Sequence, residues 1–180
     1  MSRLKLSVSK LSLTTNLTSS YLDAVFLSLG SNQGDRLEFI RSSISALNAL
    51  PACVEIEVSQ MYETAAWGRV EQPDFLNCVV KMKINRELYL ASSESNGDIA
   101  HVEQLLRDLR LIEDAHGRQR TSAKWSARTI DIDILIYNDT CFQSSTLTIP
   151  HFQMCQRKFV LIPLADLAPE LQIPGTGASV

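Results

Sequence analysis

The sequence lacks the patterns that mark membrane proteins, zinc sites and disulfide frameworks. None of its apolar runs approaches the roughly 18 residues that a membrane-spanning helix needs. Only four of the 180 residues are cysteines, Cys53, Cys78, Cys141 and Cys155, and none forms the CxxC pair typical of a zinc site. They lie in or beside apolar segments, and a chain of this length needs no disulfides to hold a core together. We therefore expect four reduced core thiols and no membrane contact.

Excess charge of one sign is also missing. The 17 Lys and Arg residues stand against 20 Asp and Glu residues, which gives a formal net charge of −3. Proteins held on nucleic acid by bulk electrostatics are usually basic, so we expect no nucleic-acid partner. The Walker-type GxxxxGK(S/T) loop and the GxSxG motif are both absent, so neither of these two catalytic frameworks applies. With 45% hydrophobic and 21% charged residues, the composition is that of one globular domain.

Residues 1–22 differ from the remainder of the chain. They contain three basic residues, no acidic residue and many Ser and Thr, and their apolar residues are too interrupted for a secretory signal. We expect them to form a flexible extension of a domain that covers residues 23–180, in a protein of the cytoplasm. A Ser-rich, basic and acid-poor segment also partly fits a transit peptide, so targeting to an organelle is the alternative.

Hydrophobic periodicity predicts six elements in the order strand, helix, strand, strand, helix, strand. Apolar residues alternate, or form a short run, in the four expected strands at 24–29, 54–58, 76–84 and 130–134. They recur every three or four positions in the two expected helices, at 37–47 and 99–112. This order is that of the α+β, ferredoxin-like βαββαβ fold, an antiparallel sheet with both helices on one face. A C-terminal helix is expected near 159–167 and a surface loop at 85–98.

The sheet face opposite the helices is expected to be available for function. Asp131 and Asp133 alternate with isoleucines on the last strand, so both side chains project from that face. Two carboxylates at this separation repel unless a cation lies between them, and Mg²⁺ favours such oxygen ligands. The alternative is a pair of solvated acids on an open face.

A basic segment immediately precedes the acidic pair. Residues 116–128 contain four cations and no acid, and Arg157 and Lys158 follow further on. Arginine binds phosphate oxygens through two parallel hydrogen bonds, and lysine binds them as a point charge. Metal-binding carboxylates beside such a segment are typical of phosphoryl transfer, which depends on positioning and charge neutralisation. The alternative is a solvated basic loop.

The segment Arg128-Thr-Ile-Asp-Ile-Asp-Ile134 resembles the signature of the 6-hydroxymethyl-7,8-dihydropterin pyrophosphokinase family of folate biosynthesis. The resemblance covers about residues 24–174. It includes, in order, residues 26–32, 72–77, 117–120, Trp125, 148–151 and 157–164. Several motifs in the right order are more specific than any one of them. The family fold is the ferredoxin-like arrangement that the periodicity predicts.

The resemblance implies that the protein transfers the terminal diphosphate of ATP to the hydroxymethyl group of the pterin and releases AMP. Asp131 and Asp133 would then hold two Mg²⁺ ions, and Arg118 and Arg128 would clamp the reacting phosphates as the other catalytic residues. The implied ATP-binding residues are Leu106, Arg120, Lys124, Trp125, Ile134, Thr148, His151 and Arg157. The implied pterin-binding residues are Gly30, Thr64, Phe75, Asn77, Trp125 and Phe159.

The sequence departs from the family pattern at three places. Lys124 stands where the family often has Arg, and Ala65-Ala66-Trp67 replaces a Pro-rich stretch. Thr146 occupies a position that can be Arg, so we expect one contact to phosphate or ribose to be absent there. In some organisms this domain is fused to dihydropteroate synthase, and the sequence leaves open whether this chain is part of such a fusion.

A non-catalytic ferredoxin-like module, binding RNA or a small molecule, is the alternative function. RNA-recognition domains carry aromatic residues on two central strands, whereas the first strand here offers Phe26 alone. A small-molecule regulatory module would not need an acidic pair and an arginine-rich segment together. Both features therefore favour the enzyme.

Overall fold

The structure is a computed structural model that describes residues 21–66, 72–92, 99–119 and 126–180. Within these residues the main strands are β1 (Leu22–Ser31), β2 (Cys53–Val58), β3 (Tyr62–Thr64), β4 (Phe75–Asn85) and β5 (Asp131–Tyr137). A small hairpin consists of β6 (Phe142–Gln143) and β7 (Thr148–Ile149). The α-helices are α1 (Arg36–Ala49), α2 (Arg86–Ser92), α3 (Ala100–Ala115) and α4 (Lys158–Leu167), and a 3₁₀ turn covers Met154–Gln156.

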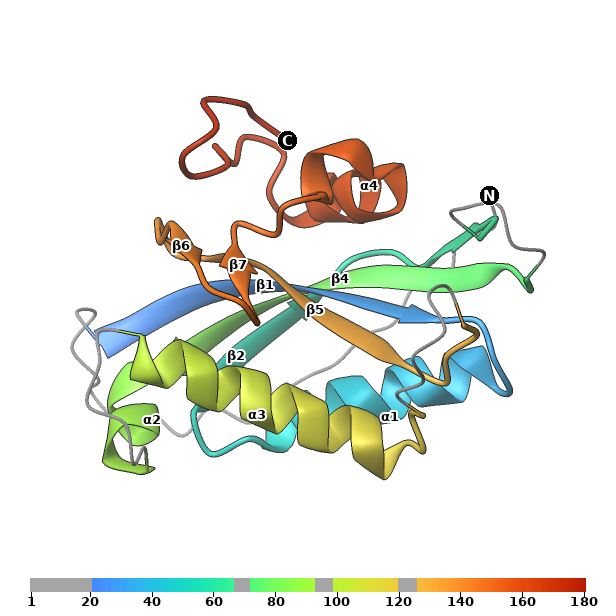
Figure 1. The fold of residues 1–180 in the computed structure, drawn as a ribbon, viewed down its shortest axis with the longest axis horizontal. Helices are drawn as coiled ribbons and strands as arrows, with labels where there is room; N and C mark the ends of the chain where they lie inside the picture. Colours follow the sequence, from blue (N-terminus) through green and yellow to red (C-terminus); the bar gives the residue numbers. More distant parts are fainter. Residues whose placement is uncertain (1–20, 67–71, 93–98, 120–125) are drawn as a thin grey trace.

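The sheet has the strand order β2-β4-β1-β5, with every neighbouring pair antiparallel, and β3 extends the β2 side of β4 (Figure 1). This confirms the ferredoxin-like order predicted from the periodicity. Gly30 of β1 pairs with Asn77 on one side and with Asp131 on the other. Because paired residues lie side by side across a sheet, three neighbouring strands bring these residues into one row.

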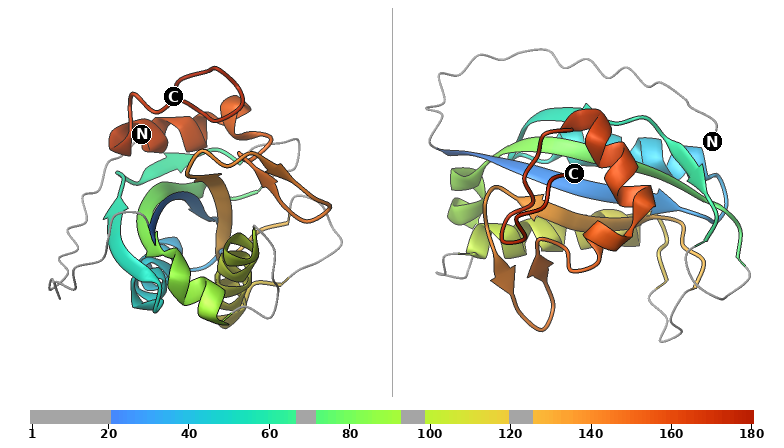
Figure 2. Two further views of the ribbon diagram at one scale, coloured as in Figure 1. Left: turned by 90° about the vertical axis from the view of Figure 1, so that its left-hand side faces the viewer. Right: turned by 90° about the horizontal axis from the view of Figure 1, so that it is seen from above.

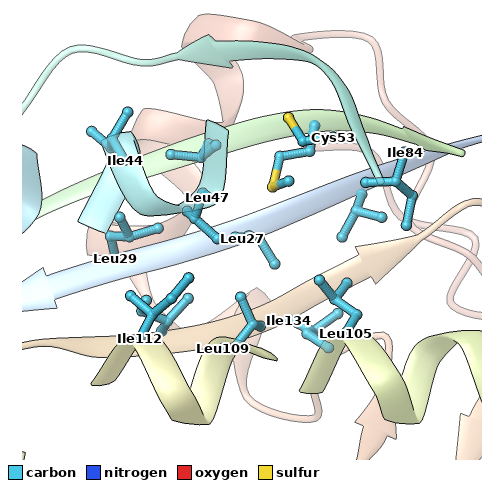
Figure 3. Close-up of a cluster of buried hydrophobic side chains, with 14 of the residues drawn as sticks. Leu27, Leu29, Ile44, Leu47, Cys53, Ile84, Leu105, Leu109, Ile112 and Ile134 are labelled. Carbon is cyan, nitrogen blue, oxygen red and sulfur yellow. The ribbon is translucent and has the colours of Figure 1, made fainter. Parts of the chain in front are cut away.

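The helices α1, α2 and α3 lie on one face of the sheet (Figure 1). The main core fills the space between this face and the helices α1 and α3, where Leu27 of β1, Leu47 of α1 and Leu109 of α3 are all fully buried (Figure 3). Helix α1 begins after Asp35, whose carboxylate accepts a hydrogen bond from the Glu38 amide at 3.0 Å. Such a side chain satisfies a backbone donor that the first helical turn leaves free.

Helix α4 and the C-terminal residues lie on the opposite face of the sheet (Figures 1 and 2). A second buried cluster forms there, in which Phe26 and Val79 of the sheet pack with Val160 and Leu164 of α4. The face expected to be open is therefore partly covered. The middle of β1 is buried on both faces of the sheet, and its sequence is therefore a continuous apolar run rather than an alternating pattern. The uncovered part lies beside the first turn of α4.

Several local expectations were wrong or lie outside the described residues. Residues 86–92 form α2 rather than the start of a surface loop, and β1 begins at Leu22 within the expected extension. None of the four cysteines is in a disulfide, but Cys141 and Cys155 are exposed rather than in the core. The expected flexible segment 1–20 falls outside the described residues. In the part of the chain that the structure describes, no helix has the length and apolar character to cross a membrane.

Candidate active site

Two adjoining pockets share Asp131 and Asp133 as a common wall. The first pocket lies over β1 and β4 and is lined mainly by Ser28, Gly30, Thr64, Phe75, Asn77, Arg128, Arg157 and Phe159. The second pocket lies between α3, β5 and the β6–β7 hairpin and is lined mainly by Leu106, Arg110, Glu113, Arg118, Ile134, Thr146, Thr148, His151 and Phe152. The acidic pair can therefore contact a ligand in either pocket.

Three arginines surround the acidic pair. The Asp131 carboxylate accepts from Arg118 Nη2 at 2.6 Å and also from Arg128 Nη1. Arg157 Nη1 lies 3.8 Å from Asp133 Oδ2. Shielding from water, and then the charge of Asp131, raise the pKa of Asp133 to about 6 in spite of these cations. Two carboxylates this close favour a further positive charge between them.

Glu113 is a site residue that the sequence reasoning missed. Its side chain is 5% exposed, and its Oε1 accepts a hydrogen bond from the backbone N–H of Ile132 at 2.8 Å. The same oxygen pairs with Arg118 Nη1, so Glu113 fixes the guanidinium that reaches Asp131. An acidic residue directly after Ile112, on the apolar face of the helix, was the signal in the sequence.

Asn32 connects the two segments that flank the first pocket. The sequence analysis included it in the motif at 26–32 but did not identify it as a site residue. It is 1% exposed, and its Oδ1 accepts from the Arg128 backbone N–H at 2.7 Å. Its Nδ2 donates to Gln72 Oε1 and to the Pro73 carbonyl, both at 3.2 Å. One buried amide thus fixes the start of the segment that carries the acidic pair and the segment that leads into Phe75.

The structure brings five of the six residues predicted to bind a pterin into the first pocket. Asn77 donates to Thr64 Oγ1 at 2.9 Å, and its Oδ1 lies over Gly30. A Cβ atom at Gly30 would come within 2.8 Å of that oxygen, so only glycine fits here without a shift. Phe75 and Phe159 also line the pocket, and the Arg157 guanidinium lies 5.6 Å from the Phe159 ring centroid. Trp125 lies outside the described residues.

The predicted ATP-binding residues divide between the two pockets. Leu106, Ile134, Thr148 and His151 line the second pocket, as does the catalytic candidate Arg118. Arg157 lines the first pocket, at the boundary that Asp133 forms. Burial, together with the nearby Arg157, lowers the pKa of His151 to about 4, so its ring is neutral at pH 7. Arg120 and Lys124 fall outside the described residues.

The site consists of arginine-flanked carboxylates between two pockets. On this fold, such an arrangement is typical of enzymes that transfer phosphoryl groups. Comparisons with known proteins identify the family. Residues 26–169 match the family model "7,8-dihydro-6-hydroxymethylpterin-pyrophosphokinase (HPPK)". The 2-amino-4-hydroxy-6-hydroxymethyldihydropteridine pyrophosphokinase of Haemophilus influenzae is 33% identical over 151 residues, which cover 84% of this chain and 85% of that protein. The protein of the same name from Pseudomonas aeruginosa is 35% identical, with 85% of each covered. The chain belongs to the HPPK family.

Longer proteins contain a similar region. The folic acid synthesis protein fol1 of Schizosaccharomyces pombe is 38% identical over 84% of this chain, which spans only 19% of fol1. A crystal structure of Plasmodium falciparum HPPK-DHPS with SDX-DHP superimposes with a TM-score of 0.58 at 16% identity, over 87% of this chain and 42% of that chain. At this identity the superposition confirms the fold alone. Family membership argues against the alternative of a non-catalytic module.

Proposed function

We propose that this protein transfers the terminal diphosphate of ATP to the hydroxymethyl group of 6-hydroxymethyl-7,8-dihydropterin and releases AMP, with Mg²⁺ as its metal. Membership of the HPPK family supports the reaction. The observation that carries the proposal is the position of Asp131 and Asp133 as the shared wall of two pockets. Such a wall suits a reaction in which two substrates meet. The cytoplasmic location and an association with dihydropteroate synthase stay predictions.

The donor set fits Mg²⁺. Among the described residues no group of three or more His, Cys, Asp or Glu side chains is placed to hold a metal, so a full protein cage is not available there. Mg²⁺ usually takes one or two carboxylates and completes its shell with water and substrate phosphates. Asp131 and Asp133 are such a pair, and shielding from water, followed by the charge of Asp131, raises the pKa of Asp133. When bound, Mg²⁺ would neutralise phosphate charge and orient the phosphate oxygens.

The chain's own residues bind and orient the two substrates. The first pocket provides two aromatic rings for the faces of a flat pterin and an amide, Asn77, for its polar edge. The arginines beside Asp131 supply the donors for the phosphate oxygens. The pterin hydroxymethyl oxygen bonds to the β-phosphorus and loses its proton to water, and the bond from that phosphorus to the oxygen of the α-phosphate breaks, with the electron pair staying on AMP. AMP then leaves from the second pocket.

The decisive assay combines the protein with ATP, the pterin alcohol and Mg²⁺. We expect AMP, separated by chromatography, and a pterin product heavier by one diphosphate in equal amount. Omission of the pterin should leave ATP intact, and the Asp131→Asn protein should form no AMP above background. Formation of ADP, or of AMP without the pterin, would disprove the proposed reaction.

The pterin assignment predicts that Phe75→Ala and Asn77→Ala weaken pterin binding and leave ATP binding unchanged. Aromatic stacking contributes on the order of 1 kcal/mol beyond area burial, so we expect the pterin Kd to rise about tenfold. Calorimetry in the presence of a non-reactive ATP analogue measures this. Phe152→Ala is the matched control, because this ring lines the other pocket. An unchanged pterin Kd in a folded Phe75→Ala protein would move the pterin to another site.

A further inference from the structure

Arg110 is a cation in the second pocket to which neither the sequence pattern nor the proposed reaction assigns a role. It lies on α3, is exposed, and lines the pocket beside the acidic pair. Three arginines that line the two pockets, Arg118, Arg128 and Arg157, each pair with a carboxylate. Within the part of the chain that the structure describes, Arg110 forms no such ion pair. Its charge is therefore available to a ligand.

The second pocket is apolar at one end and charged at the other. Leu106 and Ile134 form the apolar part, whereas Glu113, Arg118 and Asp131 form the charged part. A nucleotide has the same polarity, because its flat base has apolar faces and its phosphates are anionic. The base therefore fits the Leu106 end, and the terminal phosphates fit the Arg118 end.

Arg110 lies between these two ends. It follows Leu106 by four residues and precedes Glu113 by three, and positions three or four apart lie on one side of an α-helix. At 1.5 Å per residue, the axial distance from Leu106 is about 6 Å and that to Glu113 about 4.5 Å. A nucleotide that spans the pocket in this direction would bring the junction of its α-phosphate and ribose near Arg110.

The wall opposite α3 does not supply a second cation there. The β6–β7 hairpin lines the pocket with Ser144, Ser145, Thr146 and Thr148, which are uncharged (Figure 1). His151 on the same side is neutral at pH 7. Among the described residues, the positive charge in the middle of the pocket therefore comes from α3.

We propose that Arg110 binds the α-phosphate of the nucleotide and so holds the AMP part of ATP, both in the substrate complex and as the leaving group. This inference rests on the proposed function, because it assumes that the second pocket binds the nucleotide. It makes Arg110 a nucleotide-binding residue separate from Arg118 and Arg128, which face the acidic pair. Its contact is a charge-assisted hydrogen bond to phosphate oxygen.

The test compares AMP with adenosine, which differ only in the phosphate. Calorimetric titrations use the wild-type protein, Arg110→Ala, Arg110→Lys and the control Arg107→Ala. Arg107 is exposed on the same helix, donates to Gln104, and does not line the pocket. We expect Arg110→Ala to raise the Kd of AMP about tenfold and to leave that of adenosine within twofold. Arg110→Lys should keep part of the affinity, and Arg107→Ala all of it.

Two outcomes would overturn the inference. An unchanged AMP Kd in Arg110→Ala would mean that the guanidinium does not contact the phosphate. An equal loss for AMP and adenosine would place the contact on the ribose or base instead. Failure of the proposed function is distinguishable, because it would appear as the absence of AMP formation by the wild-type protein with the pterin, whatever the Arg110 variants do. Circular dichroism of each variant verifies that it is folded.

Discussion

Replacement of Asp133 with asparagine will lower kcat about a thousandfold and will raise the stability of the metal-free protein at pH 7.5. Metal ions supply several kcal/mol of transition-state stabilisation, and each 1.4 kcal/mol is a factor of ten in rate, which gives the expected loss of turnover. The gain in stability follows from the environment of the carboxylate. Partial shielding from water, and then the neighbouring Asp131, make its charged form unfavourable in the folded protein.

The pH dependence of stability follows from the direction of this shift. The pKa of Asp133 in the folded protein, about 6, lies above the value of 3.8 expected without such an environment. The folded protein therefore holds the proton more tightly than the unfolded chain does. Above pH 6 the charged carboxylate destabilises the fold, and this destabilisation fades as the pH falls towards 4. The stability advantage of Asp133→Asn should shrink over the same range.

Thermal unfolding in EDTA, between pH 4 and pH 8, measures this effect. The Asp133 side chain is 40% exposed, so screening by solvent limits the gain to about 1 kcal/mol, or 2–4 °C in Tm. Asp139→Asn, an exposed acid in the turn after β5, is the matched control and should leave activity and Tm unchanged. Added Mg²⁺ should raise the Tm of the wild-type protein and not that of Asp133→Asn. Wild-type turnover by Asp133→Asn in saturating Mg²⁺ would refute the metal assignment.

The second large effect is expected for Arg128→Ala. Its guanidinium pairs with Asp131, and its backbone is fixed independently by Asn32. The substitution therefore removes a phosphate donor without disturbing the fold. Hydrogen-bond donors directed at the charge that develops in the transition state typically increase the rate about 10²- to 10³-fold. We expect a loss of about this size in the chemical step and a change of less than about threefold in the ATP Kd.

Single-turnover quench experiments separate the chemical step from binding. Arg41→Ala, which removes an exposed arginine from α1, controls for the loss of one positive charge and should behave as wild type. A weaker ATP Kd with an unchanged single-turnover rate would show that Arg128 contributes to ground-state binding only. Arg118→Ala is a less clean variant, because it would also remove the ion pair of the buried Glu113.

Patterns that repeat within one element could be predicted from the sequence. The alternation of Asp131 and Asp133 with isoleucines, and the helical period of 99–112, placed these elements and their buried faces correctly. Short elements could not be predicted in this way. The three residues of β3, the seven of α2 and the two of each hairpin strand are too few to show a period. They form because longer neighbours position them.

The contacts of Asn32 and Glu113 could not be predicted for a different reason. Asn32 meets Arg128 across a separation of 96 residues, and Glu113 meets Ile132 across 19. Nothing local in the sequence distinguishes Asn32 from an ordinary turn asparagine, and the position of Glu113 on the apolar face of its helix marks it as unusual without naming its partners. The exposure of Cys141 and Cys155 is similar, because apolar neighbours along the chain do not determine whether a thiol faces the core. Family resemblance identified the pocket residues but not the residues that hold them.

The placement of α4 has a consequence for local unfolding. Arg157 directly precedes this helix and Phe159 lies in its first turn, yet the second cluster rather than the main core anchors the helix. Pro163 lacks an N–H and so leaves the Phe159 carbonyl without its helical hydrogen bond. Local opening of this helix would leave the main core intact, and each opening would remove a wall of the first pocket. Hydrogen exchange should accordingly be faster in α4 than in β1, and pterin with a non-reactive ATP analogue should slow it in α4.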